Sequence, residues 1–210
     1  LQGTIGGAHE VTNLTINSSA GAAGTIEIVG IGDSDQVGVT GTAAIGNTST
    51  ATLTLDGTIY KTTGAQTYTA AAGQNIDITG VATFTTTNTA VGFATAGVDL
   101  ANNGTTTINT GAGAGTVSFG AAIETNGGDN DALTITSGTG NVTFTGAVGA
   151  TEELGGLSVN AAGGDGDITF TSTIGDGSNA GVIGTTVIGG TATDALHFNG
   201  AIYSFDGGTT

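Results

Sequence analysis

The stretch VTFTGAV, residues 142–148, recurs along the chain in recognisable variants. Each copy reads apolar, any residue, apolar, two or three small residues, and apolar again. From Val117 onward, successive copies begin at nearly equal intervals. An internal period of roughly 25 residues is typical of repeat proteins, in which each unit is one small piece of regular structure. The other clear copies are VSFGAAI (117–123), ITFTSTI (168–174), LHFNGAI (196–202) and LTLDGTI (53–59).

A second phrase precedes the first within several units. Both phrases alternate apolar and polar residues between Gly, Asn and Asp turns, a pattern that predicts short β-strands. No stretch combines helical spacing of apolar residues with helix caps, so we expect an all-β protein. The copies of the second phrase are NLTIN (13–17), TTINT (106–110), ALTIT (132–136) and GLSVN (156–160).

A unit of about 25 residues with short strands cannot bury its apolar residues alone, whereas stacked units share a continuous core. We therefore predict a parallel β-solenoid (β-helix) with coils of about 25 residues, each about 4.8 Å from the next. It forms a single repeat-built domain over residues 1–210. The interval from Ile76 to Val117 is much longer than the others, so we expect an irregular insertion at about 82–105.

The alternative is an antiparallel β-sandwich, or a pair of them. Asp56-Gly57 and Asn199-Gly200 follow a strand-like segment, and such dipeptides favour tight hairpin turns. The same slot holds Thr171-Ser172, which suits those turns poorly because both central residues need positive φ. A shared solenoid bend accommodates all these pairs, and it also predicts a ladder of stacked rings in the core. The ladder consists of Phe119, Phe144, Phe170 and Phe198.

Composition excludes several classes of function. The chain has no Cys, so neither disulfides nor thiolate metal sites can form. It has one Lys, no Arg and 17 acidic residues, which argues against a nucleic-acid partner because phosphates need cationic side chains. No run of about 18 apolar residues exists, so we expect no membrane insertion by a helix.

Acidic pairs recur in the predicted turns and make calcium the best-supported cofactor. Hard cations prefer several carboxylate and carbonyl oxygens at once, and stacked coils would bring such pairs together. We expect solvated turns with no bound ion, and specific calcium sites are the alternative. The candidate ligands are Asp33, Asp35, Asp129, Asp131, Asp165 and Asp167.

No catalytic residues are expected. The chain lacks a GxSxG nucleophile motif, and its two histidines, His9 and His197, have no catalytic context. Glu152 and Glu153 are adjacent acids, but a glycosidase needs two carboxylates that converge across a cleft. We therefore do not expect an enzyme, and a polysaccharide-acting β-helix is a remote alternative.

The segment GNVTFTGAVGATEELGGLSVNAAGGDGDITFTSTIG (140–175) resembles the Gly/Thr/Asn-rich β-strand repeats of giant bacterial surface proteins. These are the filamentous-haemagglutinin-like proteins and other large adhesins. The resemblance implies a secreted, right-handed parallel β-solenoid on a Gram-negative cell surface, with a role in adhesion, biofilm or appendages. It brings no catalytic signature.

Both ends of the sequence read as ordinary repeat material without a capping helix. An uncapped sheet edge recruits further strands. Either the chain is a piece of a longer rod, or neighbouring copies complete its ends. On the second interpretation we expect a homopolymer, a subunit of an extracellular filament or layer that joins end to end by strand addition. An adhesin stalk that binds a glycan or another cell-surface ligand is the alternative.

Overall fold

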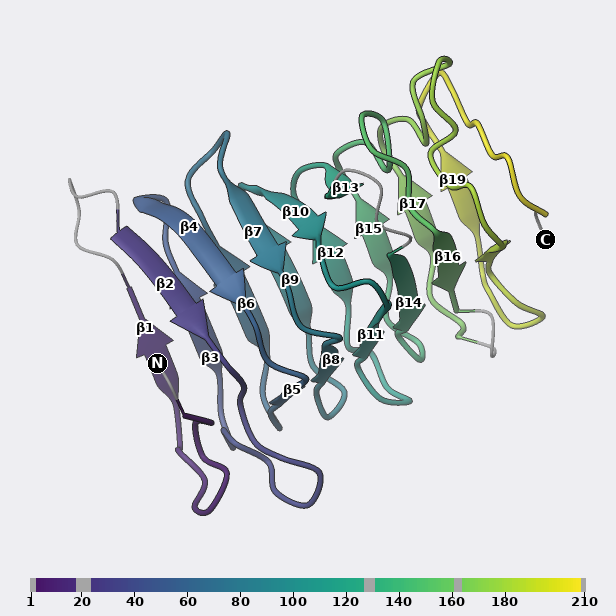
Figure 1. Ribbon diagram of the computed structural model, residues 1–210. Coiled ribbons are helices and arrows are strands. Elements are labelled where there is room, and N and C mark those ends of the chain that lie inside the picture. The colour runs from purple at the N-terminus through teal and green to yellow at the C-terminus, as the bar shows by residue number, and fades with distance from the viewer. Residues whose placement is uncertain (1–2, 18–23, 127–130, 161–163, 209–210) are drawn as a thin grey trace.

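The computed structural model describes residues 3–17, 24–126, 131–160 and 164–208. Within these residues the regular elements are all β-strands, and every strand pair is parallel. The strands wind as successive coils along one axis, with the N-terminal coil at one end and the C-terminal coil at the other (Figure 1). The parallel β-solenoid is confirmed and the antiparallel sandwich is wrong.

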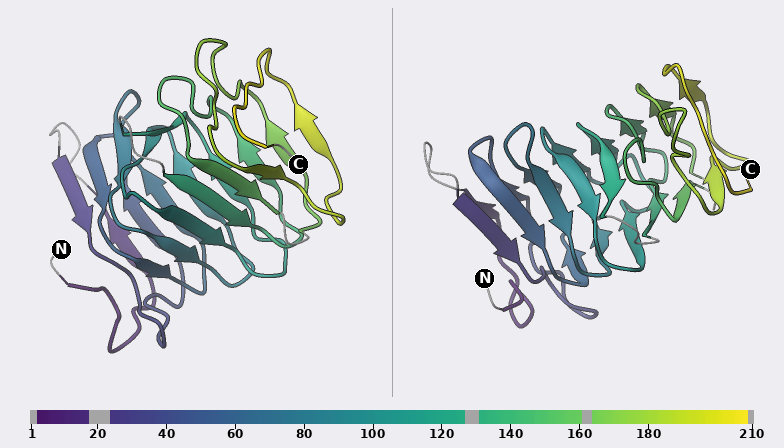
Figure 2. Two further views of the ribbon diagram at one scale, coloured as in Figure 1. Left: turned by 45° about the vertical axis from the view of Figure 1, so that its right-hand side comes forward. Right: turned by 45° about the horizontal axis from the view of Figure 1, so that its top comes forward.

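Three sheets make three faces of the coil (Figure 2). The first sheet has eight strands in the order β1 (Leu14–Ile16), β3 (Ala43–Gly46), β6 (Gln66–Thr69), β9 (Val91–Ala94), β12 (Val117–Phe119), β15 (Val142–Phe144), β17 (Ile168–Phe170) and β19 (Leu196–Phe198). The second sheet contains β2 (Gly24–Ile28), β4 (Thr50–Leu55), β7 (Asn75–Ile78), β10 (Gly97–Leu100) and β13 (Ile123–Thr125). The third contains β5 (Ile59–Lys61), β8 (Thr83–Thr85), β11 (Thr105–Asn109), β14 (Ala132–Thr136), β16 (Gly156–Val159) and β18 (Thr186–Ile188).

The strand register gives the length of each coil. In the first sheet, Leu14 pairs with Ala43, and Ala43 in turn pairs with Gln66. These pairings, and those further along the sheet, advance the chain by roughly 25 residues per coil, as the repeat predicted. Because every coil returns to the same register, apolar positions of successive coils lie on top of one another and form one core.

An aromatic ladder fills this core behind the first sheet, as the sequence predicted. Neighbouring rings lie with centroids 4.5 to 5.4 Å apart and planes within 19° of parallel. The ladder extends two coils further toward the N-terminus than expected, because Tyr68 and Phe93 occupy the same inward position. Its members are Tyr68, Phe93, Phe119, Phe144, Phe170 and Phe198.

A buried amide replaces an apolar residue at one level of the core. Gln66 occupies the inward position that Val91 takes in the next coil. Its amide nitrogen donates to the carbonyl oxygens of Tyr60, at 2.8 Å, and Thr85, at 3.0 Å, and its amide oxygen accepts from the Tyr68 hydroxyl at 3.0 Å. These partners satisfy the amide in a place that water does not reach.

Glycines stack where the backbones of successive coils approach most closely. A Cβ atom on Gly140 would overlap the carbonyl oxygen of Gly115, and one on Gly166 would overlap that of Gly140. The obstacle in both cases is backbone, which cannot rotate away as a flexible side chain would. The high glycine content therefore has a steric cause at these corners.

Residues 82–105 are not an irregular insertion, and this expectation is corrected. They contain β8, β9 and β10, each paired in register with strands of the coils on both sides. The long interval arises because Ile76 lies in the second sheet, whereas Val117 lies in the first. The recurring phrase thus lies in the second sheet at Ile76 and in the first sheet at Val117. The sequence interval between these two copies is therefore longer than one coil.

Candidate functional site

The sequence-predicted calcium ligands Asp33 and Asp35 lie in the loop between β2 and β3. The Oδ1 atom of Asp33 accepts the backbone N–H of Asp35 at 2.9 Å and that of Gln36 at 2.7 Å. Gly32 precedes this turn at a φ of +74°, a conformation that favours glycine. Asp33 therefore closes its own turn, and the Asp35 side chain is exposed.

Asp131 is fully buried and ties two coils together. Its Oδ1 atom accepts the backbone N–H groups of Asn102, at 3.2 Å, and Gly104, at 3.0 Å. Both donors lie in the preceding coil, between β10 and β11. Asp131 thus holds two coils together, and its predicted partner Asp129 lies outside the described residues.

Asp165 and Asp167 lie between β16 and β17, far along the chain from the other predicted ligands. The Asp165 side chain is exposed, and the backbone N–H of Asp167 donates to the Oδ1 atom of Asn141 at 3.0 Å. Among the described residues, no three His, Cys, Asp or Glu side chains come close enough to hold a metal ion. The structure does not bring the predicted pairs together, and calcium binding stays a prediction.

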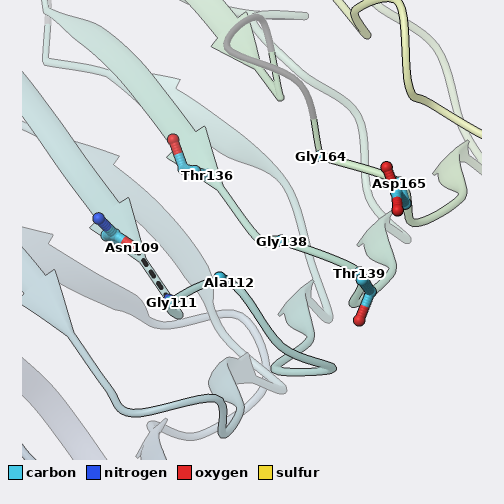
Figure 3. A pocket seen from close by; sticks show the side chains of 8 residues that line it. All are labelled: Asn109, Gly111, Ala112, Thr136, Gly138, Thr139, Gly164 and Asp165. Atoms are coloured by element: carbon cyan, nitrogen blue, oxygen red, sulfur yellow. Dashed lines mark hydrogen bonds between the residues drawn. The ribbon is translucent and has the colours of Figure 1, made fainter.

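A groove of about 380 Å³ runs over one corner of the third sheet (Figure 3). Asn109 of β11 and Thr136 of β14 lie side by side at its edge, in register. The Asn109 Oδ1 atom accepts the N–H of Gly111 at 2.9 Å. The exposed lining is more apolar than polar, and its polar part consists of hydroxyl, amide and backbone groups and one carboxylate. The lining residues are Asn109, Gly111, Ala112, Thr136, Gly138, Thr139, Gly164 and Asp165.

The outer face of the second sheet carries a feature that the sequence reasoning missed. Asp77, Asp99 and Glu124 are in register on the adjacent strands β7, β10 and β13, and we call them the carboxylate row. Each sits at the polar position of an alternating strand: the third residue of NIDI and of GVDL, and the second of IET. Aligning these three strands, rather than the more conspicuous Phe-containing ones, would have revealed the row.

The row adjoins a groove of about 360 Å³, whose lining includes Asp99, Glu124 and Glu152. Glu124 is held in place because its Oε2 atom accepts the backbone N–H groups of Thr151, at 3.1 Å, and Glu152, at 3.0 Å. The Oδ1 atom of Asp99 is buried and has no hydrogen-bond partner. Glu152 thus adds a carboxylate beside the row, whereas the adjacent Glu153 does not line this groove.

Burial raises the pKa of all three carboxyl groups in the row, and repulsion from the other two members adds to the rise at Asp99. Burial, followed by the charges of Asp77 and Glu124, raises the pKa of Asp99 to about 6. Burial also raises the pKa of Asp77 and of Glu124, although the N–H groups that Glu124 accepts oppose this rise. The exposed turn residue Asp176 shows the opposite effect, because the N–H groups of Asn179 and Ser178 lower its pKa.

The last strand of the first sheet and the corner after it expose apolar side chains, which we call the end face. Leu196 is 44% exposed, Phe198 43% and Ile202 36%. The Phe198 ring stacks on Phe170, with centroids 5.4 Å apart, and contacts Tyr203 edge-on at 4.9 Å. One side of this ring is therefore part of the aromatic ladder while the other is uncovered. His197, which lies between the two apolar residues of β19, is also exposed.

Comparisons with protein families, with curated proteins and with solved structures found no match to this chain. Across residues 3–17, 24–126, 131–160 and 164–208, no helix has the length and apolar character to cross a bilayer. The role of the chain must therefore be inferred from its own geometry.

Proposed function

We propose that the protein is an extracellular structural rod, a subunit of a bacterial surface filament that grows end to end by strand addition. The observation that supports the proposal is the constant register of the first sheet, in which each coil covers the apolar residues of the coil before it, as β19 covers Ile168 and Phe170 of β17. The apolar residues Leu196 and Phe198 of β19 gain free energy when a further coil covers them, whether that coil belongs to the same chain or to a second copy. An edge strand also supplies a row of backbone groups for pairing.

A second copy of the chain offers a matching strand. Strand β1 is at the other edge of the first sheet, and its Leu14, Thr15 and Ile16 show the same alternation as Leu196, His197 and Phe198. Pairing β19 with β1 of the next copy would place Leu196 beside Leu14 and Phe198 beside Ile16. The sheet would then continue across the junction with main-chain hydrogen bonds and buried apolar side chains.

The charge distribution is compatible with end-to-end growth. The strands of the first sheet carry no acidic residue, so pairing β19 with β1 brings no strand carboxylates together. The chain nevertheless has a formal net charge of −16, so copies repel one another at long range. Salt screens this repulsion, and association should strengthen as ionic strength rises.

Sedimentation velocity and negative-stain microscopy at rising protein concentration, in low and in high salt, test the proposal. We expect the wild type to form filaments, more readily at high salt, and Phe198→Lys to remain monomeric because a charge replaces the uncovered ring. His197→Lys is the matched control, since its side chain lies on the outer face of the same strand. A wild type that stays monomeric throughout, or two variants that assemble equally well, would refute the proposal.

A second candidate is an adhesin segment that binds a neutral glycan. The groove of Figure 3 favours it, because hydroxyl and amide groups that suit sugar hydroxyls line a depression of about 380 Å³. Thr136→Val keeps the shape and removes the hydroxyl. Binding on a glycan array that this variant abolishes would support the adhesin role, and no binding by the wild type would exclude it.

A further inference from the structure

The carboxylate row places three like charges on neighbouring strands of a parallel sheet. Asp99 pairs in register with Asp77 on one side and with Glu124 on the other. Strands in a sheet are about 4.8 Å apart, and like charges directly opposite one another destabilise it. Asp99 is the central member, so it experiences repulsion from both sides.

No cationic side chain in the described residues neutralises the row. The single Lys of the sequence, Lys61, belongs to the third sheet, and its Nζ atom donates to the backbone carbonyl of Ser34 at 3.0 Å. Within the described residues, the charged groups that act on Asp99 are all acidic: Asp77 on β7, Glu124 on β13, and Asp131 and Glu152 in the adjoining segments.

Hydrogen bonding distinguishes the members of the row. Glu124 accepts two backbone N–H groups, which favour its ionised form. The buried Oδ1 atom of Asp99 accepts none. A proton bound to Asp99 would remove the central charge and provide an O–H donor for a neighbouring carboxylate, as in other carboxyl pairs that share a proton.

We propose that the carboxylate row is a proton-operated stabilising device, which holds the coils of β7, β10 and β13 together more firmly in mildly acidic than in neutral solution. The device does not depend on filament formation, because all its groups lie within one chain.

The sign of the effect follows from proton linkage. The pKa of Asp99 is about 6 in the folded chain, whereas that of an unperturbed aspartate is 3.8. The folded chain therefore binds the proton more tightly, and its stability increases as the pH falls through about 6 toward 4. Above about pH 6 the row is ionised and this stabilisation is absent.

Urea unfolding between pH 7.5 and 4.5, at constant ionic strength, tests the device. One proton taken up on folding can raise the folding equilibrium constant by at most about tenfold per pH unit, and solvent screening reduces this. We expect a several-fold rise per unit in the wild type below about pH 6. Asp99→Asn should be more stable than the wild type at pH 7.5 and lack most of the rise.

Asp35→Asn is the matched control, because it removes the same charge from an exposed loop and should keep the wild-type rise. Equal pH dependence in Asp99→Asn and the wild type would overturn the proposal. Carboxyl ¹³C NMR of the wild type gives a readout independent of any variant: a midpoint for Asp99 near 6 supports the device, and one near 4 overturns it.

Discussion

The ring of Phe144 lies on that of Phe170 with centroids 4.5 Å apart and planes 1° from parallel. Isolated aromatic pairs prefer offset or edge-on arrangements. Here the strand register of the first sheet sets the spacing, because Phe144 and Phe170 are register partners on β15 and β17. The backbone ladder thus determines how the core packs.

Phe144→Ala tests the contribution of the ladder. Phe144 is 1% exposed, so its removal leaves a cavity between two coils, and we expect a loss of about 3–5 kcal/mol in the free energy of unfolding. Phe198→Ala, at a position 43% exposed, should cost only about 1–2 kcal/mol. Urea unfolding of the monomer measures both, and equal losses would contradict the smaller burial of Phe198.

Gly140→Ala tests the close approach of coils. The added methyl group would overlap the carbonyl oxygen of Gly115, and we expect destabilisation by about 1–3 kcal/mol as the coils are forced apart. Gly208→Ala is the control, because nothing lies within 4 Å of its Cβ position. Thermal unfolding compares the two variants. An unchanged midpoint temperature in Gly140→Ala would show that the backbone at this corner moves to accommodate the methyl group.

Asp131→Ala tests whether the hydrogen bonds of this aspartate stabilise the contact between two coils. The substitution leaves the N–H groups of Asn102 and Gly104 without their acceptor, at a cost of about 1–3 kcal/mol for each group that stays buried. Asp131→Asn retains an oxygen acceptor and should lose less. The exposed control Asp165→Ala should change stability by less than about 0.5 kcal/mol. Loss of stability on adding EDTA to the wild type would instead indicate a bound cation.

Asp77→Asn tests repulsion within the carboxylate row. The charge of Asp77 is the largest cause, after burial, that raises the pKa of Asp99. Its removal should lower the NMR midpoint of Asp99 and move the acid stabilisation to lower pH, although burial still holds the pKa above its ordinary value. High salt should have a similar but weaker effect on the wild type. An unchanged midpoint would mean that the charge of Asp77 does not contribute to the raised pKa of Asp99.

Much of the fold was predictable because its cause is local. Alternation in phrases such as VTF and ITF predicts strands, and their regular recurrence predicts stacking, so the ladder from Phe119 to Phe198 followed directly. The position of Gln66 was not predictable, because its amide is satisfied by carbonyl groups of Tyr60 and Thr85, which the strand pattern does not connect.

The candidate site was far less predictable. The sequence pattern gave Asp33 and Asp131 the same role, that of candidate calcium ligands. In the structure, Asp33 accepts hydrogen bonds within its own turn, whereas Asp131 accepts them from the preceding coil. The carboxylate row went unnoticed because Asp77 and Glu124 lie almost two coils apart in the sequence. Only strand pairing through β10 places them on either side of Asp99.

By itself, the sequence determined that this protein is a stack of parallel β coils with phenylalanines aligned inside. Side-chain alternation and a repeat length are properties of the chain alone, and a parallel stack satisfies both better than an antiparallel sandwich does. The tertiary structure decided which of three faces each strand occupies, and so which polar groups meet. Alternation distinguishes only inside from outside, whereas the face is set by the lengths of the corners and by the register between coils.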